Sequence, residues 1–341
     1  MIKCGWVIII FLLHCQVITG QALPINSQQF FLDDRVIEVT FTTDIKKLRT
    51  QKKNPAWQPA DIVMMFSDSS IIAEQIRVRP RGIYRKNNCE IAALLLGFKN
   101  TSSPKLSPLK NIKLVGGCGS GSKDEGLLLK EYVAYKMYNF ISPMSFRVRL
   151  LHVTYKDSKQ RARTYSQYAF LIEDMKDLAD RNNCVEIKSK KFNTEATNRK
   201  QINLVGIFQY MIGNTDWAVT VLHNIKLMAS KNDTLAPPYP IPYDFDYAGL
   251  VNADYAVPGE NLDIKSVTDR LYRGYARNIN ELQVNLDIFK ETKEQLMFYV
   301  KNFRLLGSGE KKQMIRYLED FYDIVENRKT ARSVFIDKAL K

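Results

Sequence analysis

Alternating apolar and polar residues run through the first half of the chain in short stretches that predict β-strands. Some of these stretches end at turn residues, as at Pro80-Arg81-Gly82. The predicted strands are residues 36–42, 62–66, 75–79, 91–98, 112–115, 146–155 and 165–173. The last two enclose a polar loop and form a predicted hairpin. The pattern therefore predicts a β-rich N-terminal lobe over residues 21–174.

Helical spacing appears once within this lobe and then dominates the rest of the chain. Apolar residues three and four positions apart predict a long helix over 127–141, embedded in the order of the strands. Further helices are predicted at 201–212, 286–306 and 310–325, with a last one from about 328. Gly307 ends one of them and Ser308 caps the next. Residues 175–341 therefore form a predicted, mainly helical C-terminal lobe.

The first twenty residues differ from the rest of the chain. Lys3 gives a short positive start, and residues 6–13 are continuously apolar before a small residue, Gly20. The apolar run is too short to span a hydrocarbon core of about 30 Å, so we predict a secretory signal peptide over residues 1–20. No later segment is apolar enough to predict a stable transmembrane segment. We expect an exported protein that is periplasmic, extracellular or on the cell surface.

The composition narrows the class of partner. The chain has 341 residues, of which 45% are hydrophobic and 25% charged, which excludes wholesale disorder and a multi-span membrane protein. Lys and Arg number 50 against 36 Asp and Glu, and this net charge of +14 favours anionic partners such as a nucleotide. The sequence contains no stacking platform or recognised basic motif, and together with an export signal this argues against nucleic acid.

Cysteines and histidines are too few for several common sites. Cys89, Cys118 and Cys184 remain after the signal peptide, so a monomer can form at most one disulfide and keep one free thiol. Their spacing matches no zinc pattern, and His152 and His223 are the two histidines of the mature chain. The sequence therefore argues against a Cys/His metal site and against a Ser-His-Asp triad. His223 remains possible as a catalytic base, although a single histidine near an Asp in the sequence proves little.

The most informative polar residues lie in the second half of the chain. Asp216 ends a Gly-Asn-Thr-Asp segment, Asn224 opens a predicted strand at 225–228, and Asp244 and Asp246 follow another at 240–243. Phosphoryl transfer needs an Asp that orients the nucleophile and oxygen ligands for Mg²⁺, and these residues supply both. The alternative is a turn with Asx caps and an exposed strand end.

Other residues could contact a nucleotide. A glycine between arginines, as in Arg81-Gly82 with Arg85 close behind, lets the backbone approach a phosphate that the guanidinium groups bind. An ordinary basic turn is the alternative.

Two glutamates are also candidates. In kinase sites an acidic helix residue pairs with a strand lysine that holds the α- and β-phosphates. Glu131 on the predicted helix could take this part with Lys113 or Lys99, although a solvated Lys-Glu pair is equally ordinary. Glu173 ends a predicted strand at the junction of the lobes, where backbone groups could read an adenine edge. A plain strand end is the alternative there.

Taken together, residues from about Gln75 to Tyr275 resemble the CotH family, the spore-coat protein H-like secreted kinases. The resemblance rests on Arg79-Pro80-Arg81-Gly82 with Arg85, Leu128 to Asn139, Phe170 to Asp174, Gly213 to Asp216, and Tyr243 to Asp246. It implies an atypical, two-lobed protein-kinase-like α+β fold, with a β-rich N-terminal lobe and a mainly helical C-terminal lobe. It also implies an ATP-dependent kinase that acts on Ser or Thr of a secreted or envelope protein.

The resemblance assigns roles to individual residues. Asp216 matches the catalytic Asp, Asn224 and Asp244 match metal ligands, and Asp246 assists as a further ligand. The implied cofactors are ATP and Mg²⁺, with Mn²⁺ as a substitute. The residues expected to contact the nucleotide are Arg81, Gly82, Arg85, Lys113, Glu131 and Glu173.

Two departures from the family keep an alternative open. The predicted strand over residues 91–96 contains no lysine, so the nucleotide-contacting lysine must come from elsewhere or be absent. Asp216 and Asn224 are eight residues apart, whereas kinases have five, so residues 218–222 must bulge for both to share one metal site. The alternative function is a non-catalytic pseudokinase or a surface-binding module.

Overall fold

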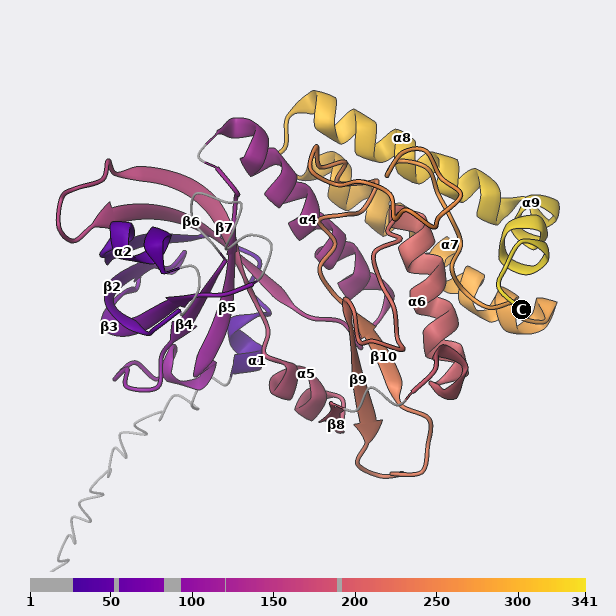
Figure 1. Ribbon diagram of the computed structural model, residues 1–341, viewed down its shortest axis with the longest axis horizontal. Coiled ribbons are helices and arrows are strands. Elements are labelled where there is room, and N and C mark those ends of the chain that lie inside the picture. Colours follow the sequence, from indigo (N-terminus) through magenta and orange to yellow (C-terminus); the bar gives the residue numbers. More distant parts are fainter. Residues whose placement is uncertain (1–26, 52–54, 83–92, 120, 189–191) are drawn as a thin grey trace, which may run out of the picture.

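The computed structural model describes residues 27–51, 55–82, 93–119, 121–188 and 192–341 (Figure 1). The predicted signal peptide at 1–20 and the candidate Arg85 lie outside the described residues. Within the described part, no helix has both the length and the apolar character needed to cross a membrane.

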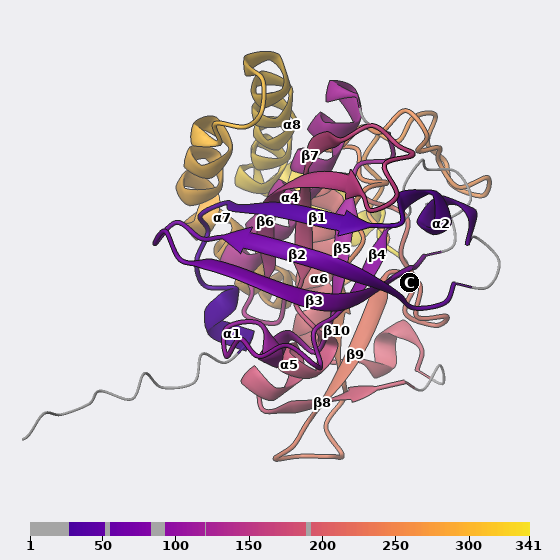
Figure 2. The same ribbon diagram turned by 90° about the vertical axis from the view of Figure 1, so that its left-hand side faces the viewer.

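Seven strands of the N-terminal part close into a barrel (Figure 2). Around the barrel they follow the order β1-β2-β3-β4-β5-β7-β6. Neighbouring strands are antiparallel, apart from β1 and β6, which run parallel and close the barrel. The strands are β1 (Ile37–Thr43), β2 (Gln58–Met65), β3 (Ile71–Pro80), β4 (Leu94–Gly97), β5 (Asn111–Gly116), β6 (Val148–Asp157) and β7 (Tyr165–Ile172).

Along these strands, successive side chains point alternately into the barrel, where they are mainly apolar, and outward, which explains the apolar–polar alternation in the sequence. Strand β2, for example, buries every second residue, starting with Gln58. The inward side chains form a hydrophobic core of their own, to which Phe41, Ile62, Val78 and Leu114 belong. Closure gives each of these strands a hydrogen-bonded neighbour on both sides over at least part of its length.

The predicted two-lobed, kinase-like α+β fold is therefore wrong. The pairing of β1 with β6, in which Val39 lies opposite Val153, closes the N-terminal strands into a barrel that the two-lobed kinase fold does not have. The physical reason is that alternation predicts a buried face for each strand but carries no information on which strand pairs with which.

The remaining elements are mainly helical. Strands β8 (Cys184–Ile187), β9 (Ile225–Ser230) and β10 (Tyr239–Pro242) form a small antiparallel sheet in the order β10-β9-β8. The α-helices are α1 (Ser27–Phe30), α2 (Ile45–Thr50), α4 (Ser122–Ile141), α5 (Met175–Arg181), α6 (Arg199–Ile212), α7 (Ile279–Asn302), α8 (Ser308–Glu326) and α9 (Arg328–Arg332). Short helical turns lie at Ser107–Leu109, Thr194–Ala196 and Ser333–Asp337.

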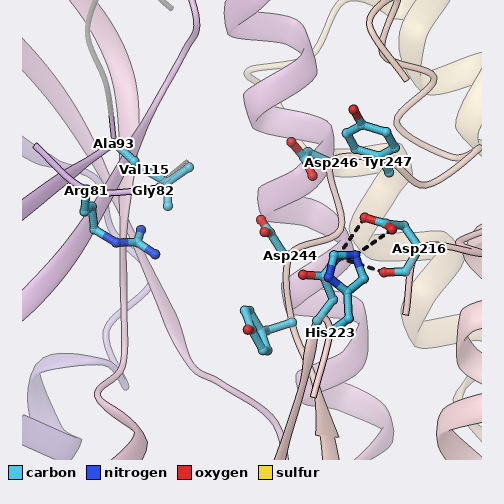
Figure 3. Close-up of a pocket in the computed structure, with 11 residues that line it drawn as sticks. Arg81, Gly82, Ala93, Val115, Asp216, His223, Asp244, Asp246 and Tyr247 are labelled. Carbon is cyan, nitrogen blue, oxygen red and sulfur yellow. Dashed lines mark hydrogen bonds and ion pairs between the residues drawn. The ribbon is translucent and has the colours of Figure 1, made fainter. Parts of the chain in front are cut away.

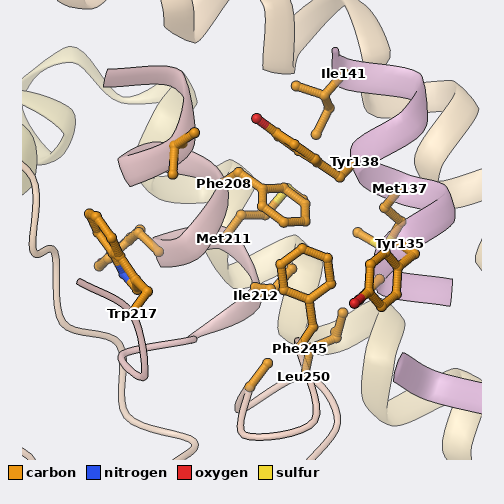
Figure 4. Packing of buried hydrophobic residues seen from close by; sticks show 14 of the residues in the cluster. Tyr135, Met137, Tyr138, Ile141, Phe208, Met211, Ile212, Trp217, Phe245 and Leu250 are labelled. Atoms are coloured by element: carbon orange, nitrogen blue, oxygen red, sulfur yellow. The ribbon is translucent and has the colours of Figure 1, made fainter. Parts of the chain in front are cut away.

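Helix α4 joins the barrel to the other helices, and its tyrosines make the contact (Figure 4). Tyr135 packs against Phe170 on the outside of β7, with ring centroids 5.7 Å apart, and against Phe245 at 4.6 Å. One turn further along, Tyr138 packs against Phe208 of α6 at 4.4 Å. The helix predicted inside the β-rich lobe thus belongs to the core of the helical part, and it fixes that part against the barrel.

Candidate functional site

A cavity of about 580 Å³ lies between the barrel and the C-terminal part. Figure 3 shows Arg81 and Gly82 on one side and Asp216, Asp244 and Asp246 on the other. The full lining is Arg81, Gly82, Ala93, Val115, Asp216, His223, Asn224, Tyr243, Asp244, Asp246 and Tyr247. The structure thus gathers the main polar candidates of the sequence around one space.

Asp216 reaches the cavity because helix α6 ends abruptly. Gly213 caps the helix in the left-handed conformation, with φ of 67°. The amide of Asn214, which is buried, then accepts a hydrogen bond from the Asp216 N–H at 3.0 Å and donates one to Gln209 at 3.0 Å. These bonds fix the turn that directs Asp216 toward the cavity.

A tight hairpin returns the chain to Asp216. Ala218 and His223 exchange two backbone hydrogen bonds of 2.9 Å, which reverses the chain within six residues. As a result the Asn224 side-chain amide donates to the backbone oxygen of Asp216 at 2.8 Å and to its carboxylate at 2.9 Å. This is the bulge that the eight-residue separation of Asp216 and Asn224 requires.

His223 lines the cavity, whereas the sequence indicated it only as a possible base. Its Nε2 lies 2.7 Å from Oδ1 of Asp216, while Oδ2 accepts the bond from Asn224. The Asp216 side chain is 38% exposed and that of His223 is 52% exposed, so both face the open cavity. The seven-residue separation gives no signal in the sequence, because only the hairpin brings the two side chains together.

Two candidate metal ligands adopt an unusual backbone conformation. Asn224 has φ of 50° and Asp244 has φ of 64°, both in the left-handed region that Asn and Asp tolerate better than most residues. The N–H of Tyr243 donates to the backbone oxygen of Asn224 at 3.1 Å, and the hydroxyl of Tyr135 accepts from the Asp244 N–H at 2.8 Å. These two hydrogen bonds help to hold the left-handed conformation, which is common at functional sites.

The barrel supplies positive charge opposite the carboxylates. Lys113 on β5 lies over the ring of Tyr243, 5.8 Å from its centroid. The pKa of Lys113 is lowered to about 8, mainly by burial and then by repulsion from Arg81 and Lys226, while the charges of Asp174 and Asp244 act in the opposite direction. Lys113 is thus near the charged groups of the cavity without being among the described residues that line it. The other candidate, Lys99, is exposed on the turn after β4.

The two glutamates predicted to contact the nucleotide lie elsewhere. Neither occurs among the described residues that line the cavity. Glu173 is fully buried, and its carboxylate accepts bonds from Arg181 at 2.9 Å and from the backbone N–H of Arg147 at 3.0 Å. Its backbone N–H donates to the oxygen of Arg147. Glu131 is buried on α4, where its charge contributes to a raised pKa of Tyr135, after the larger effect of burial.

The acidic residues do not form a ready-made metal cage. In the described part of the chain, no three His, Cys, Asp or Glu side chains are grouped so that they could hold a metal ion. Mg²⁺ often takes only one or two carboxylates and completes its coordination with water and substrate phosphates. The carboxylates of Asp244 and Asp246 and the amide oxygen of Asn224 fit such a shared site in their chemistry. Asp246 is also held by the Tyr255 hydroxyl at 3.0 Å.

Neither of the described cysteines lines the cavity. Cys118 is disulfide-bonded and Cys184 is a buried free thiol.

Comparison of the chain with protein-family models, with curated proteins and with solved structures finds no match.

Proposed function

We propose that the protein transfers the γ-phosphoryl group of ATP to a Ser or Thr hydroxyl of an exported protein. The observation that carries this proposal is the division of charge across one cavity. Arg81 lines the barrel side, and Asp216, Asp244 and Asp246 line the other. Lys113 on β5 adds positive charge behind the barrel side, near enough to Arg81 for the two charges to repel. Cations suit the phosphates of the nucleotide, and carboxylates suit Mg²⁺ and the proton of the acceptor.

In this reaction the bond between the γ-phosphorus and its bridging oxygen breaks, and a bond from phosphorus to the acceptor oxygen forms. The hydroxyl proton passes to the pair of Asp216 and His223, and ADP leaves with the bridging oxygen. Asn224 keeps the Asp216 carboxylate in place through its bond of 2.9 Å. Bound Mg²⁺, with Asp244, Asp246 and Asn224 as protein ligands, would offset phosphate charge.

A second candidate is a nucleotide-binding module without catalytic activity. One observation favours it: both carboxylate oxygens of Asp216 already accept hydrogen bonds, from His223 and from Asn224. Each oxygen of this carboxylate is thus engaged within the protein before any substrate binds.

Two variants test the proposal. Asp216→Asn should keep nucleotide affinity and lose transfer by about 10²-fold or more, because it removes the proton acceptor but keeps the volume. Asp244→Asn should lose the Mg²⁺-dependent part of ATP binding. The measurements are calorimetric titration of ATP with and without Mg²⁺, and transfer of labelled phosphate to the protein itself or to exported proteins.

The control is Asp323→Asn, an exposed carboxylate on α8 that should behave as the parent protein does. Transfer at the parent rate by Asp216→Asn would contradict the role of that residue. ATP binding that is equal and independent of Mg²⁺ in all variants would contradict the role of Asp244. Binding without any transfer by the parent protein would favour the second candidate.

A further inference from the structure

A second cavity, of about 310 Å³, lies on the other side of Asp216. The two cavities share Asp216 and Tyr247 in their linings. Apart from these residues the second cavity is mainly apolar, with Val257, Leu262 and Val267 in its walls. The carboxylate that we propose as proton acceptor therefore stands at the boundary between a charged space and an apolar one.

The apolar wall is fixed although it belongs to a long irregular segment, residues 252–278. On one side of the wall, the Tyr255 hydroxyl donates to Asp246 at 3.0 Å. On the other side, the Tyr317 hydroxyl of α8 donates to the backbone oxygen of Thr268 at 3.1 Å. Anchors at both ends hold the segment against the acidic side of the first cavity, so that its shape is preorganised for a ligand.

We propose that the second cavity is the acceptor subsite, and that it takes a Ser or Thr flanked by an aliphatic residue in an extended part of the protein substrate. This inference rests on the proposed function, because the hydroxyl must meet the γ-phosphoryl group of ATP in the first cavity. The acceptor oxygen bonds to phosphorus, its proton passes to the pair of Asp216 and His223, and ADP is released.

Size and chemistry both support this occupant. A space of about 310 Å³ admits a short stretch of polypeptide but not a folded domain. The aliphatic neighbour would pack on Val257, which is 67% exposed at the rim and therefore has apolar surface to bury. Glu260, also exposed at this cavity, disfavours an acidic residue at the same point by repulsion.

Peptide substrates test the subsite directly. A library with a central Ser or Thr would vary the neighbouring positions, and the parent protein should prefer Leu, Ile or Val there over Asp or Gly by about 10-fold in kcat/KM. Val257→Lys should lower kcat/KM for the best peptide by about 10-fold, because the aliphatic contact is lost. Val257→Ile should retain it. Since Val257 is exposed, neither variant is expected to disturb folding.

A matched control and a binding assay separate the possible failures. Leu235→Lys changes another exposed aliphatic residue, 95% exposed between β9 and β10, and should act as the parent does. ATP affinity, measured by calorimetry, should be the same in all these proteins. Absence of ATP binding by the parent would contradict the proposed function itself. Normal ATP binding without transfer to any peptide or protein would contradict the proposed function as well. Transfer to whole proteins but to no peptide, no aliphatic preference, or equal peptide kinetics for Val257→Lys and Leu235→Lys would overturn the acceptor subsite alone.

Discussion

Lys113 carries its charge at an energetic cost, so replacing it with methionine should stabilise the protein. The side chain is half-buried on β5, close to the rings of Phe146 and Tyr243 and to the charges of Arg81 and Lys226. Burial is the larger cause and repulsion the smaller one, and together they bring its pKa from 10.5 to about 8. Methionine keeps an unbranched apolar stem in the same space but has no charge to bury.

The size and sign of the effect follow from linkage. A tenfold change in proton affinity is worth about 1.4 kcal/mol. Keeping Lys113 charged in the folded protein therefore lowers the free energy of unfolding by about 3 kcal/mol at pH 7. The unfolded chain binds this proton more tightly than the folded chain does. Stability should therefore rise with pH between about 8 and 10.5. At pH 9.5 the remaining cost is about 1 kcal/mol.

Urea unfolding of the parent protein and of Lys113→Met at pH 7 and pH 9.5 measures this difference. Fluorescence of Trp217, which is buried, reports the transition. The variant should be more stable by about 3 kcal/mol at pH 7 and by about 1 kcal/mol at pH 9.5. Lys156→Met, at an exposed position of β6, is the control and should show no such pH dependence. An advantage that does not change with pH, or a less stable variant, would refute the reasoning.

The same variant should lose function as it gains stability. A bound phosphate would add negative charge near Lys113 and attract its ammonium group, so ATP affinity should fall by about 10-fold in Lys113→Met. Equal ATP affinity would mean that Lys113 does not contact the nucleotide.

Two further variants distinguish a residue that acts in phosphoryl transfer from one that stabilises the fold. His223→Gln keeps a side-chain donor toward Asp216 but cannot accept a proton, so transfer should slow by about 10-fold or more while ATP affinity stays constant; an unchanged rate would reduce His223 to a positioning residue. Glu173→Gln breaks a buried ion pair with Arg181 and should cost about 3–5 kcal/mol in urea unfolding. Glu319→Gln, on the exposed side of α8, is its control, and a similar small loss in both would contradict the buried pair.

The sequence allowed most elements to be predicted, with errors at their ends. The helix expected at 127–141 begins at Ser122, and the one expected at 286–306 is α7, which starts at Ile279 and ends at Asn302. Gly307, and not Ser308, is the N-cap of α8, where its N–H donates to Glu310 at 3.0 Å. Hydrophobic spacing reports the buried face of a helix, whereas the ends depend on caps that several neighbouring residues could supply.

The candidate site was predictable in part. Asp216, Asn224, Asp244 and Asp246 meet at one cavity because their segments carry Gly and Asx signals that mark turns. The pairing of His223 with Asp216 depends on a hairpin of six residues that has no Gly or Pro to mark it.

Candidates outside these turns were harder to place. The burial of Glu173 against Arg181 could not be predicted, because a charged residue at a strand end looks the same in sequence whether it faces solvent or a buried arginine. Closure of the barrel was likewise invisible, since pairing between distant strands leaves no local pattern.

The pairing of β1 with β6 sets an order of events for a newly made chain. Glu38 and His152 face each other across this junction at 2.8 Å although 114 residues separate them. Strand β1 is synthesised first and must wait for β6 before its second edge is covered, with α4 made in between. Contacts of such long sequence separation form slowly because a large loop must close first. During that interval β1 exposes an edge to other chains, so aggregation of the newly made chain is the hazard that this topology creates.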